Sequence, residues 1–165
     1  MVLTDYTTYD DIRAALGVGK TEITDATLSL ELYANGLRLE LMAVNPLLPS
    51  KYGELPSDAD ALSLDQTNFR LGARMFATYA VAKHLTTSLP LFSPKDIGDG
   101  KALMGRYSFD PYKLVISGVM ARYHEFKGVL EAAYAVLFAA AEVAQVPPIG
   151  GFRAVSPSYD PVRGI

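Results

Sequence analysis

Apolar side chains recur every three or four residues along much of the chain, a spacing typical of amphipathic helices. The longest such stretch lies between Asp110 and Ala144. Asp110 suits the N-cap of a helix and Pro111 its first position, where a backbone N–H is not needed. The pattern therefore predicts one long C-terminal helix. Its apolar positions are Tyr112, Val115, Val119, Tyr123, Phe126, Leu130, Ala133, Leu137 and Ala141.

This helix is long for a small protein. Over residues 111–144 it would measure ~51 Å, whereas a compact domain of this size spans only about 40 Å. We therefore expect the helix either to project from the body or to kink. Gly118 and Gly128 are the positions where it bends most easily, because each weakens a helix by about 1 kcal/mol relative to alanine.

A short helix is predicted near the N-terminus, over residues 9–16. Thr8 and Asp11 form a capping-box-like start, and Gly17 supplies the end signal. So short a helix is unstable alone and must dock on another element.

A third helix is predicted over residues 65–88. Ser63 and Gln66 cap its start, and Leu89-Pro90 follows its end. Its small residues would allow a neighbouring helix to approach closely. The apolar face comprises Phe69, Ala73, Phe76 and Ala80, with Gly72, Met75 and Tyr79 beside it, and the small residues are Gly72, Ala73, Ala77 and Ala80.

The stretch from Leu28 to Val44 fits two structures. Alternating leucines about an Asn35-Gly36 pair suit a β-hairpin with a type I′ turn. The other residue types favour a helix, since no β-branched residue stands between Thr27 and Val44. We favour the helix, with Thr24-Asp25 as a cap. Its apolar stripe would be Leu30, Tyr33, Leu37, Leu41 and Val44.

Residues 45–64 are predicted to form a long acidic surface loop. They contain Pro46, Pro49, Gly53 and Pro56 together with Asp58 and Asp60. Turn-forming residues at this density are typical of loops, and loops of this length are usually functional or flexible.

Two further segments lie towards the C-terminus. A short helical segment is predicted to begin at Ser93-Pro94, or at Asp99 ahead of residues 101–107. Residues 145–165 are rich in proline and glycine, which precludes a helix or packed sheet. This segment nevertheless keeps several large apolar side chains. We therefore expect a helical domain over residues 1–144, followed by an extended tail that orders on a partner.

The part of the long helix at residues 132–141 is apolar all round and must be covered on every side. Two interpretations are open, burial by the chain's own fold or burial against copies of the chain, and we favour the second. The candidate subunit-packing residues are Tyr134, Val136, Leu137 and Phe138.

Composition and charge narrow the possible functions. The 165 residues are half apolar with a formal net charge of −3, which suits a compact domain but not non-specific binding to nucleic acid. The chain is acidic up to Asp65 and net basic after it, so identical subunits could pair these surfaces. We find no secretory signal, and residues 132–141 are too few for a membrane span. We expect synthesis in the cytoplasm and no membrane partner.

Two motifs come close to known chemistry but each lacks a required residue. Residues 17–21 resemble the end of a phosphate-binding loop, but Ala14 stands where its first glycine is required. His124-Glu125 begins a zinc-protease-like string, but Gly128 stands in place of the second histidine. Neither motif supports a site.

The remaining polar residues offer little material for catalysis. Cysteine is absent, and the other histidine, His84, suits an interaction with a helix C-terminus. Acidic pairs such as Asp58 with Asp60, or Asp96 with Asp99 beside Lys101, are more typical of turns than of cation sites. We expect no catalytic, cofactor or metal site, and no enzymatic activity.

Two stretches of the sequence, residues 9–28 and residues 79–97, resemble the head-to-tail connector (adaptor) proteins of tailed bacteriophages. The first reads YDDIRAALGV and continues to EITDATL, and the second reads YAVAKHL and continues to PKDI. The order of a short helix, a loop, longer helices and an extended C-terminal segment also fits that family.

The resemblance implies a structural protein of the virion neck. Family members form a ring, typically twelve-membered, below the portal, joining the capsid to a tail or nozzle protein, and DNA passes through without sequence-specific binding. In such proteins the C-terminal segment reaches towards the portal. The residues to which the resemblance gives this role are Pro148, Ile149, Phe152, Arg153, Tyr159, Arg163 and Ile165.

Two other classes of function remain open. A helical-bundle module could bind a partner or an apolar ligand in a pocket lined by Tyr123, Phe126, Tyr134 and Phe138. A small hydrolase could instead use the acidic loop with a cation.

Taken together, the helix pattern and the resemblance lead us to expect an all-α bundle with a long C-terminal helix and a tail, assembling into a ring.

Overall fold

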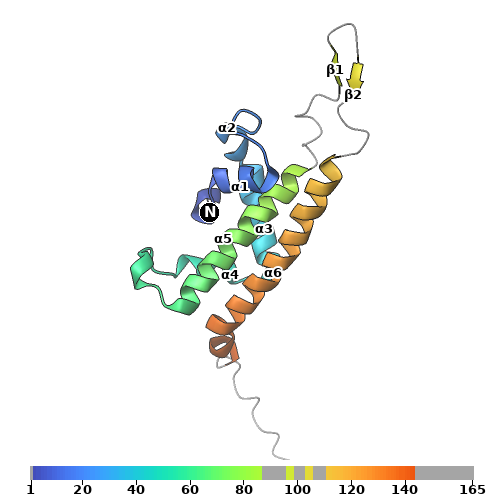
Figure 1. Cartoon of the computed structure of the whole chain (residues 1–165). Coiled ribbons are helices and arrows are strands. Elements are labelled where there is room, and N and C mark those ends of the chain that lie inside the picture. Colours follow the sequence, from blue (N-terminus) through green and yellow to red (C-terminus); the bar gives the residue numbers. More distant parts are fainter. Residues whose placement is uncertain (1, 87–95, 99–102, 106–110, 144–165) are drawn as a thin grey trace, which may run out of the picture.

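The computed structural model describes residues 2–86, 96–98, 103–105 and 111–143. In these ranges the regular elements are helices, as predicted, apart from one short pair of strands (Figure 1). The elements are η1 (Leu3–Asp5), α1 (Tyr9–Leu16), α2 (Asp25–Leu28), α3 (Glu31–Val44), α4 (Leu48–Gly53), η2 (Ala59–Ala61), α5 (Leu64–Leu85), β1 (Asp96–Gly98), β2 (Leu103–Gly105) and α6 (Pro111–Val143).

Helix α5 is the centre of the body and packs against α1, α3 and α6. It runs side by side with α6 over most of its length (Figure 1). The two backbones approach closely because α5 presents small residues, as the sequence predicts. A Cβ atom added at Gly72 would lie 3.7 Å from the Cα of Leu130. Ala73 and Ala77 on the same helix are fully buried.

Helix α6 confirms the prediction of a long C-terminal helix. It has 33 residues against 22 in α5, so it must extend beyond its partner. It continues through Gly118 and Gly128 without interruption. Its predicted cap Asp110 and the predicted tail over residues 145–165 lie outside the described residues.

The predicted helix ends near the N-terminus and before α5 are confirmed. The Thr8 side chain accepts a hydrogen bond from the Asp11 backbone N–H, at 3.1 Å. Gly17 ends α1 with φ at 69°, a left-handed conformation that favours glycine. Ser63 and Gln66 form a full capping box at the start of α5.

The choice of a helix over a hairpin for residues 28–44 is also confirmed, with a break. Thr24 caps the single turn of α2, and the chain then restarts as α3 after Leu30, which is extended. Leu37 and Leu41 are fully buried. Asn35-Gly36, the candidate hairpin turn, lies inside α3.

The prediction of a plain loop over residues 45–64 is wrong for part of its length. Residues 48–53 form α4, with Pro49 in the first turn, where its missing N–H costs no helical hydrogen bond. Leu48 is fully buried, and the Tyr52 ring stacks on Tyr6 with centroids 4.2 Å apart. This segment is therefore part of the folded body.

The prediction of a short helix within residues 93–107 is also wrong. Residues 96–98 and 103–105 are antiparallel strands, with Ile97 paired to Met104. Gly98 and Gly105 each weaken a helix by about 1 kcal/mol relative to alanine, and Ile97 favours extended backbone. Figure 1 shows the strand pair beyond the end of α5 and the start of α6.

Candidate interaction surfaces

Of the four candidate subunit-packing residues, three lie in the seam between α5 and α6. Tyr134 is buried, and Leu137 and Phe138 are partly buried against the core. The Phe138 ring meets that of Phe69 edge-on at 5.4 Å. Only Val136 is exposed, at 66%. Residues 134, 137 and 138 therefore serve the chain's own core, and the outer side of α6 is left uncovered.

The outer side of α6 is an exposed apolar face, which we call the α6 face. It carries Leu114 and Val136, which are 65% and 66% exposed, and at its edge Val129, which is 46% exposed and lies beside Gly72 of α5. Along the same face of the helix stand Gly118, Ala121, Glu125 and Ala132, which are also exposed. Sequence reasoning identified only Val136, although Leu114 and Val129 also stand off the predicted core stripe.

Helix α3 has a second exposed apolar face, which we call the α3 face. It consists of Leu32, Leu39 and Met42, of which the leucines are 71% and 69% exposed. These residues lie on the side of the helix away from the buried Leu37 and Leu41. In the sequence, Leu32 and Leu39 belong to the alternation that suggested a hairpin, and nothing there predicts this face.

The four aromatic residues considered for an apolar-ligand pocket contact other rings. Tyr123 lies 5.4 Å from Phe76, and Phe126 stacks on Tyr79 at 5.4 Å. Tyr134 and Phe138 lie 5.1 Å from each other, and both contact Phe69. In the part of the chain that the structure describes, these side chains fill the seam between α5 and α6.

A polar cluster around Glu40 ties α3, α5 and α6 together. The Glu40 carboxylate accepts hydrogen bonds from the Lys83 ammonium and from the Tyr123 hydroxyl, the latter at 2.6 Å. His84 Nε2 lies 3.6 Å away. Burial by itself would raise the pKa of Glu40, but these hydrogen bonds and the Lys83 charge outweigh it and hold that pKa below its ordinary value.

We expect the free energy of unfolding to fall as the pH drops below about 4.5, the ordinary pKa of this carboxyl group. Because the folded pKa of Glu40 is the lower one, its contribution is complete above the unfolded pKa and disappears as the pH falls through the folded value. Glu40→Gln should flatten this dependence and cost about 1–3 kcal/mol at neutral pH. Urea unfolding at a series of pH values measures both effects.

The exposed Glu54, paired only with Lys51 on its own helix turn, provides the control variant Glu54→Gln. Some pH dependence should persist in both variants, because hydrogen bonds from Lys20 and Arg13 also lower the pKa of Asp25. A Glu40→Gln profile as steep as that of the control would contradict the role assigned to Glu40.

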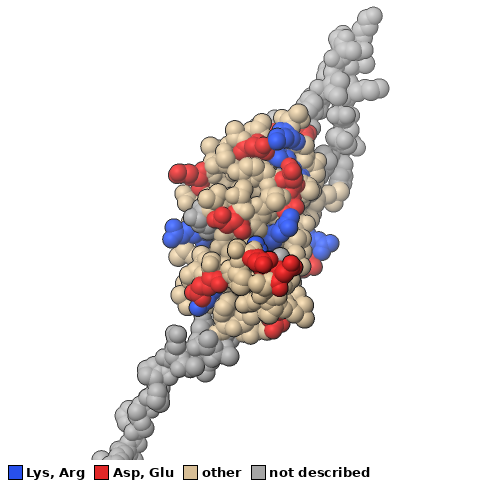
Figure 2. All heavy atoms as spheres, turned by 90° about the vertical axis from the view of Figure 1, so that its left-hand side faces the viewer, with Lys and Arg blue, Asp and Glu red and all other residues tan. Residues whose placement is uncertain are grey.

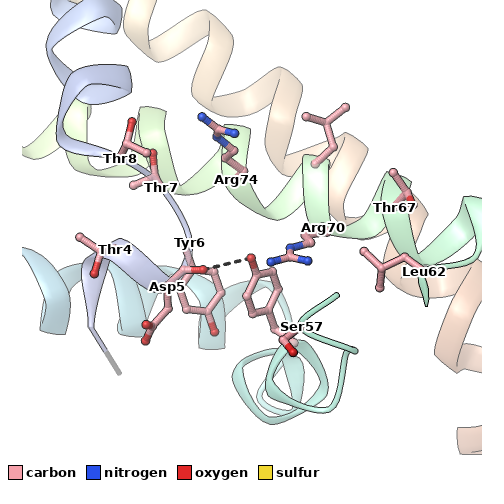
Figure 3. Close-up of a pocket in the computed structure, with 12 residues that line it drawn as sticks. Thr4, Asp5, Tyr6, Thr7, Thr8, Ser57, Leu62, Thr67, Arg70 and Arg74 are labelled. Atoms are coloured by element: carbon pink, nitrogen blue, oxygen red, sulfur yellow. Dashed lines mark hydrogen bonds between the residues drawn. The ribbon is translucent and has the colours of Figure 1, made fainter. Parts of the chain in front are cut away.

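A pocket of about 430 Å³ lies between η1, the segment after α4 and the first half of α5 (Figure 3). The Tyr52 hydroxyl donates to the Asp5 carbonyl at 3.1 Å, and the Arg74 guanidinium binds Asp11 at 2.7 Å. Burial, with Tyr52 and Asp5 nearby, raises the pKa of Tyr6 to about 12. The pocket also holds the half-buried Arg70, whose guanidinium could hydrogen-bond an anionic group.

The other polar motifs of the sequence give no site in the described residues. No group of three or more His, Cys, Asp or Glu residues stands close enough there to hold a metal ion. Asp58 Oδ1 accepts from the Asp60 backbone N–H at 3.1 Å, as in an ordinary turn. Gly17 caps a helix, and no strand precedes it in the described residues. Asp99 and Lys101 lie outside the described residues.

Acidic and basic side chains are mixed on the face shown in Figure 2, which carries no broad positive patch. Non-specific contact with a DNA backbone usually requires clustered Lys and Arg side chains. No described helix is long and apolar enough to cross a membrane.

No protein-family model matches the chain, and no curated protein or solved structure matches it either. Only the fold and the exposed surfaces therefore bear on its function. They define the class as an all-α protein with two exposed apolar helix faces.

Proposed function

We propose that this chain is a structural protein of a tailed-phage virion, the head-to-tail adaptor that forms a ring below the portal. It joins the capsid to the tail or nozzle protein and leaves a central channel for DNA. Its place is the neck of the virion, after synthesis in the host cytoplasm.

The α6 face carries this proposal. Scattered exposed apolar residues are normal, but three large ones on one face of a long helix are typical of an interaction surface. Burying such a face against copies of the chain is favourable at roughly 25 cal/mol per Å² of apolar area. Identical subunits that meet through different patches close into a ring when the rotation between them allows it.

The order of elements supports the same proposal. The two stretches that resemble phage adaptors contain α1 and the end of α5, and the long helix follows. The tail residues Pro148, Ile149, Phe152, Arg153, Tyr159, Arg163 and Ile165 are proposed to bind portal. The acidic balance of the chain suits a channel in which DNA slides without being held.

The direct test is assembly with the portal protein encoded in the same genome. Electron microscopy of the mixture should show an added ring at one end of the portal, and native mass spectrometry should count about twelve copies. Light scattering of the chain alone separates a ring-former from a monomeric ligand-binding module. A chain that neither binds portal nor occurs in purified virions would refute the proposal.

A further inference from the structure

The α3 face and the α6 face match each other in spacing. Leu32 and Leu39 stand seven residues apart on α3. In helix packing a large side chain enters the space between four residues of the facing helix, and such spaces recur every seven residues. On α6, two such spaces follow each other and share Glu125, and among their residues only Val129 is a large apolar one. The first is formed by residues 118, 121, 122 and 125, and the second by residues 125, 128, 129 and 132.

Both spaces on α6 are open in the structure. A side-chain carbon added at Gly118 or Gly128 would meet no atom within 4 Å. Ala121 and Ala132 are exposed and small. We propose that the α3 face of one copy packs on the α6 face of the next copy, with Leu32 and Leu39 entering these two spaces. This inference rests on the proposed function and names the surfaces through which neighbouring subunits meet.

The charges beside the two faces are complementary. Arg38 and Glu31 flank the leucines on α3, are exposed, and make no ion pair within the described residues. On α6, Arg122 and Glu125 are part of the walls of these spaces, about half exposed and paired with each other at 2.7 Å. The contact brings Arg38 to Glu125, whereas α6 packed on a second α6 would bring two copies of Glu125 together.

A second copy is the occupant that covers both faces at once. A dimer through two α3 faces would leave the α6 face of each copy in water. A dimer through two α6 faces would leave both α3 faces exposed. Pairing α3 with α6 uses a different patch on each copy, so the contact repeats and buries both faces in every subunit of a closed ring.

The chain has no cysteine, so single cysteines can report the contact. Asn35→Cys lies between the two leucines, and Ala121→Cys borders the first space, so neither variant removes a proposed contact. The two variants, mixed at about millimolar concentration with a short bis-maleimide, should form a cross-linked dimer that neither forms alone. Arg38→Glu on the first variant should abolish the cross-link, and Glu125→Arg on the second should restore it. Lys20→Cys, at an exposed side chain outside α3, replaces Asn35→Cys as the control.

Each outcome decides between explanations. A stronger cross-link from either single variant alone would show like-with-like pairing and overturn the inference. Absence of any cross-link would overturn it as well, and portal binding by the same protein would then leave the proposed function standing. A specific α3–α6 cross-link in a chain that does not bind portal would support the interface and refute the adaptor.

Discussion

Replacing Phe69 with alanine should lower the free energy of unfolding by about 3–5 kcal/mol, close to the limit that a protein of this size tolerates. Phe69 is fully buried at the point where α4, α5 and α6 meet. Its ring lies 6.2 Å from Tyr52, 6.2 Å from Tyr134 and 5.4 Å from Phe138. The substitution leaves a cavity lined by rigid rings that cannot collapse into it, which places the loss in the upper part of the range.

Urea unfolding followed by far-UV circular dichroism measures this change. Leu71→Ala is the matched control, because Leu71 lies on the same helix but is 57% exposed. The control should change stability by less than about 0.5 kcal/mol. A loss below about 1 kcal/mol for Phe69→Ala would show that the aromatic cluster does not hold α6 against the body.

The helix ends could be predicted from the sequence because they depend on local hydrogen bonds. The side chains of Thr8 and Ser63 bond backbone N–H groups three residues further on, and Gly17 adopts a conformation that other residues avoid. None of these effects requires knowledge of distant parts of the chain. The same reasoning found α6, whose apolar period is long and regular.

The leucines of residues 28–41 show where a local pattern becomes ambiguous. Their alternation suggested a hairpin. In the structure the alternation arises because leucines stand on two sides of the helices, one buried and one exposed. Leu28, Leu37 and Leu41 are buried, whereas Leu30, Leu32 and Leu39 are exposed. Which side faces the core depends on where α5 lies, and the sequence of α3 does not contain that information.

The candidate surfaces were predictable only in part for the same reason. Residues 132–141 were predicted to be covered on every side, but the division between the covered Tyr134 and the exposed Val136 follows from the position of α5. The Glu40 cluster was not predicted, since its partners Lys83 and Tyr123 stand 43 and 83 residues away in the sequence. No local pattern connects groups so far apart.

Deleting residues 145–165 should abolish binding to portal and assembly with it, while leaving the helix content of the remaining chain unchanged. The deletion begins after α6 has ended at Val143, and within the described residues the last aromatic contact of α6 with α5 is that of Phe138. The body therefore keeps its core. The deleted segment contains Ile149, Phe152 and Tyr159, large apolar side chains that an extended segment can place in pockets of a partner.

Circular dichroism and co-sedimentation with portal measure the two halves of this prediction. A full-length variant with Ile149, Phe152 and Tyr159 replaced by serine keeps the length of the segment and removes its apolar anchors. This variant should lose portal binding as completely as the deletion, because chain length alone supplies no affinity. If the deleted chain still assembled on portal, the contact would have to come from the helical body, and the role of residues 145–165 would be wrong.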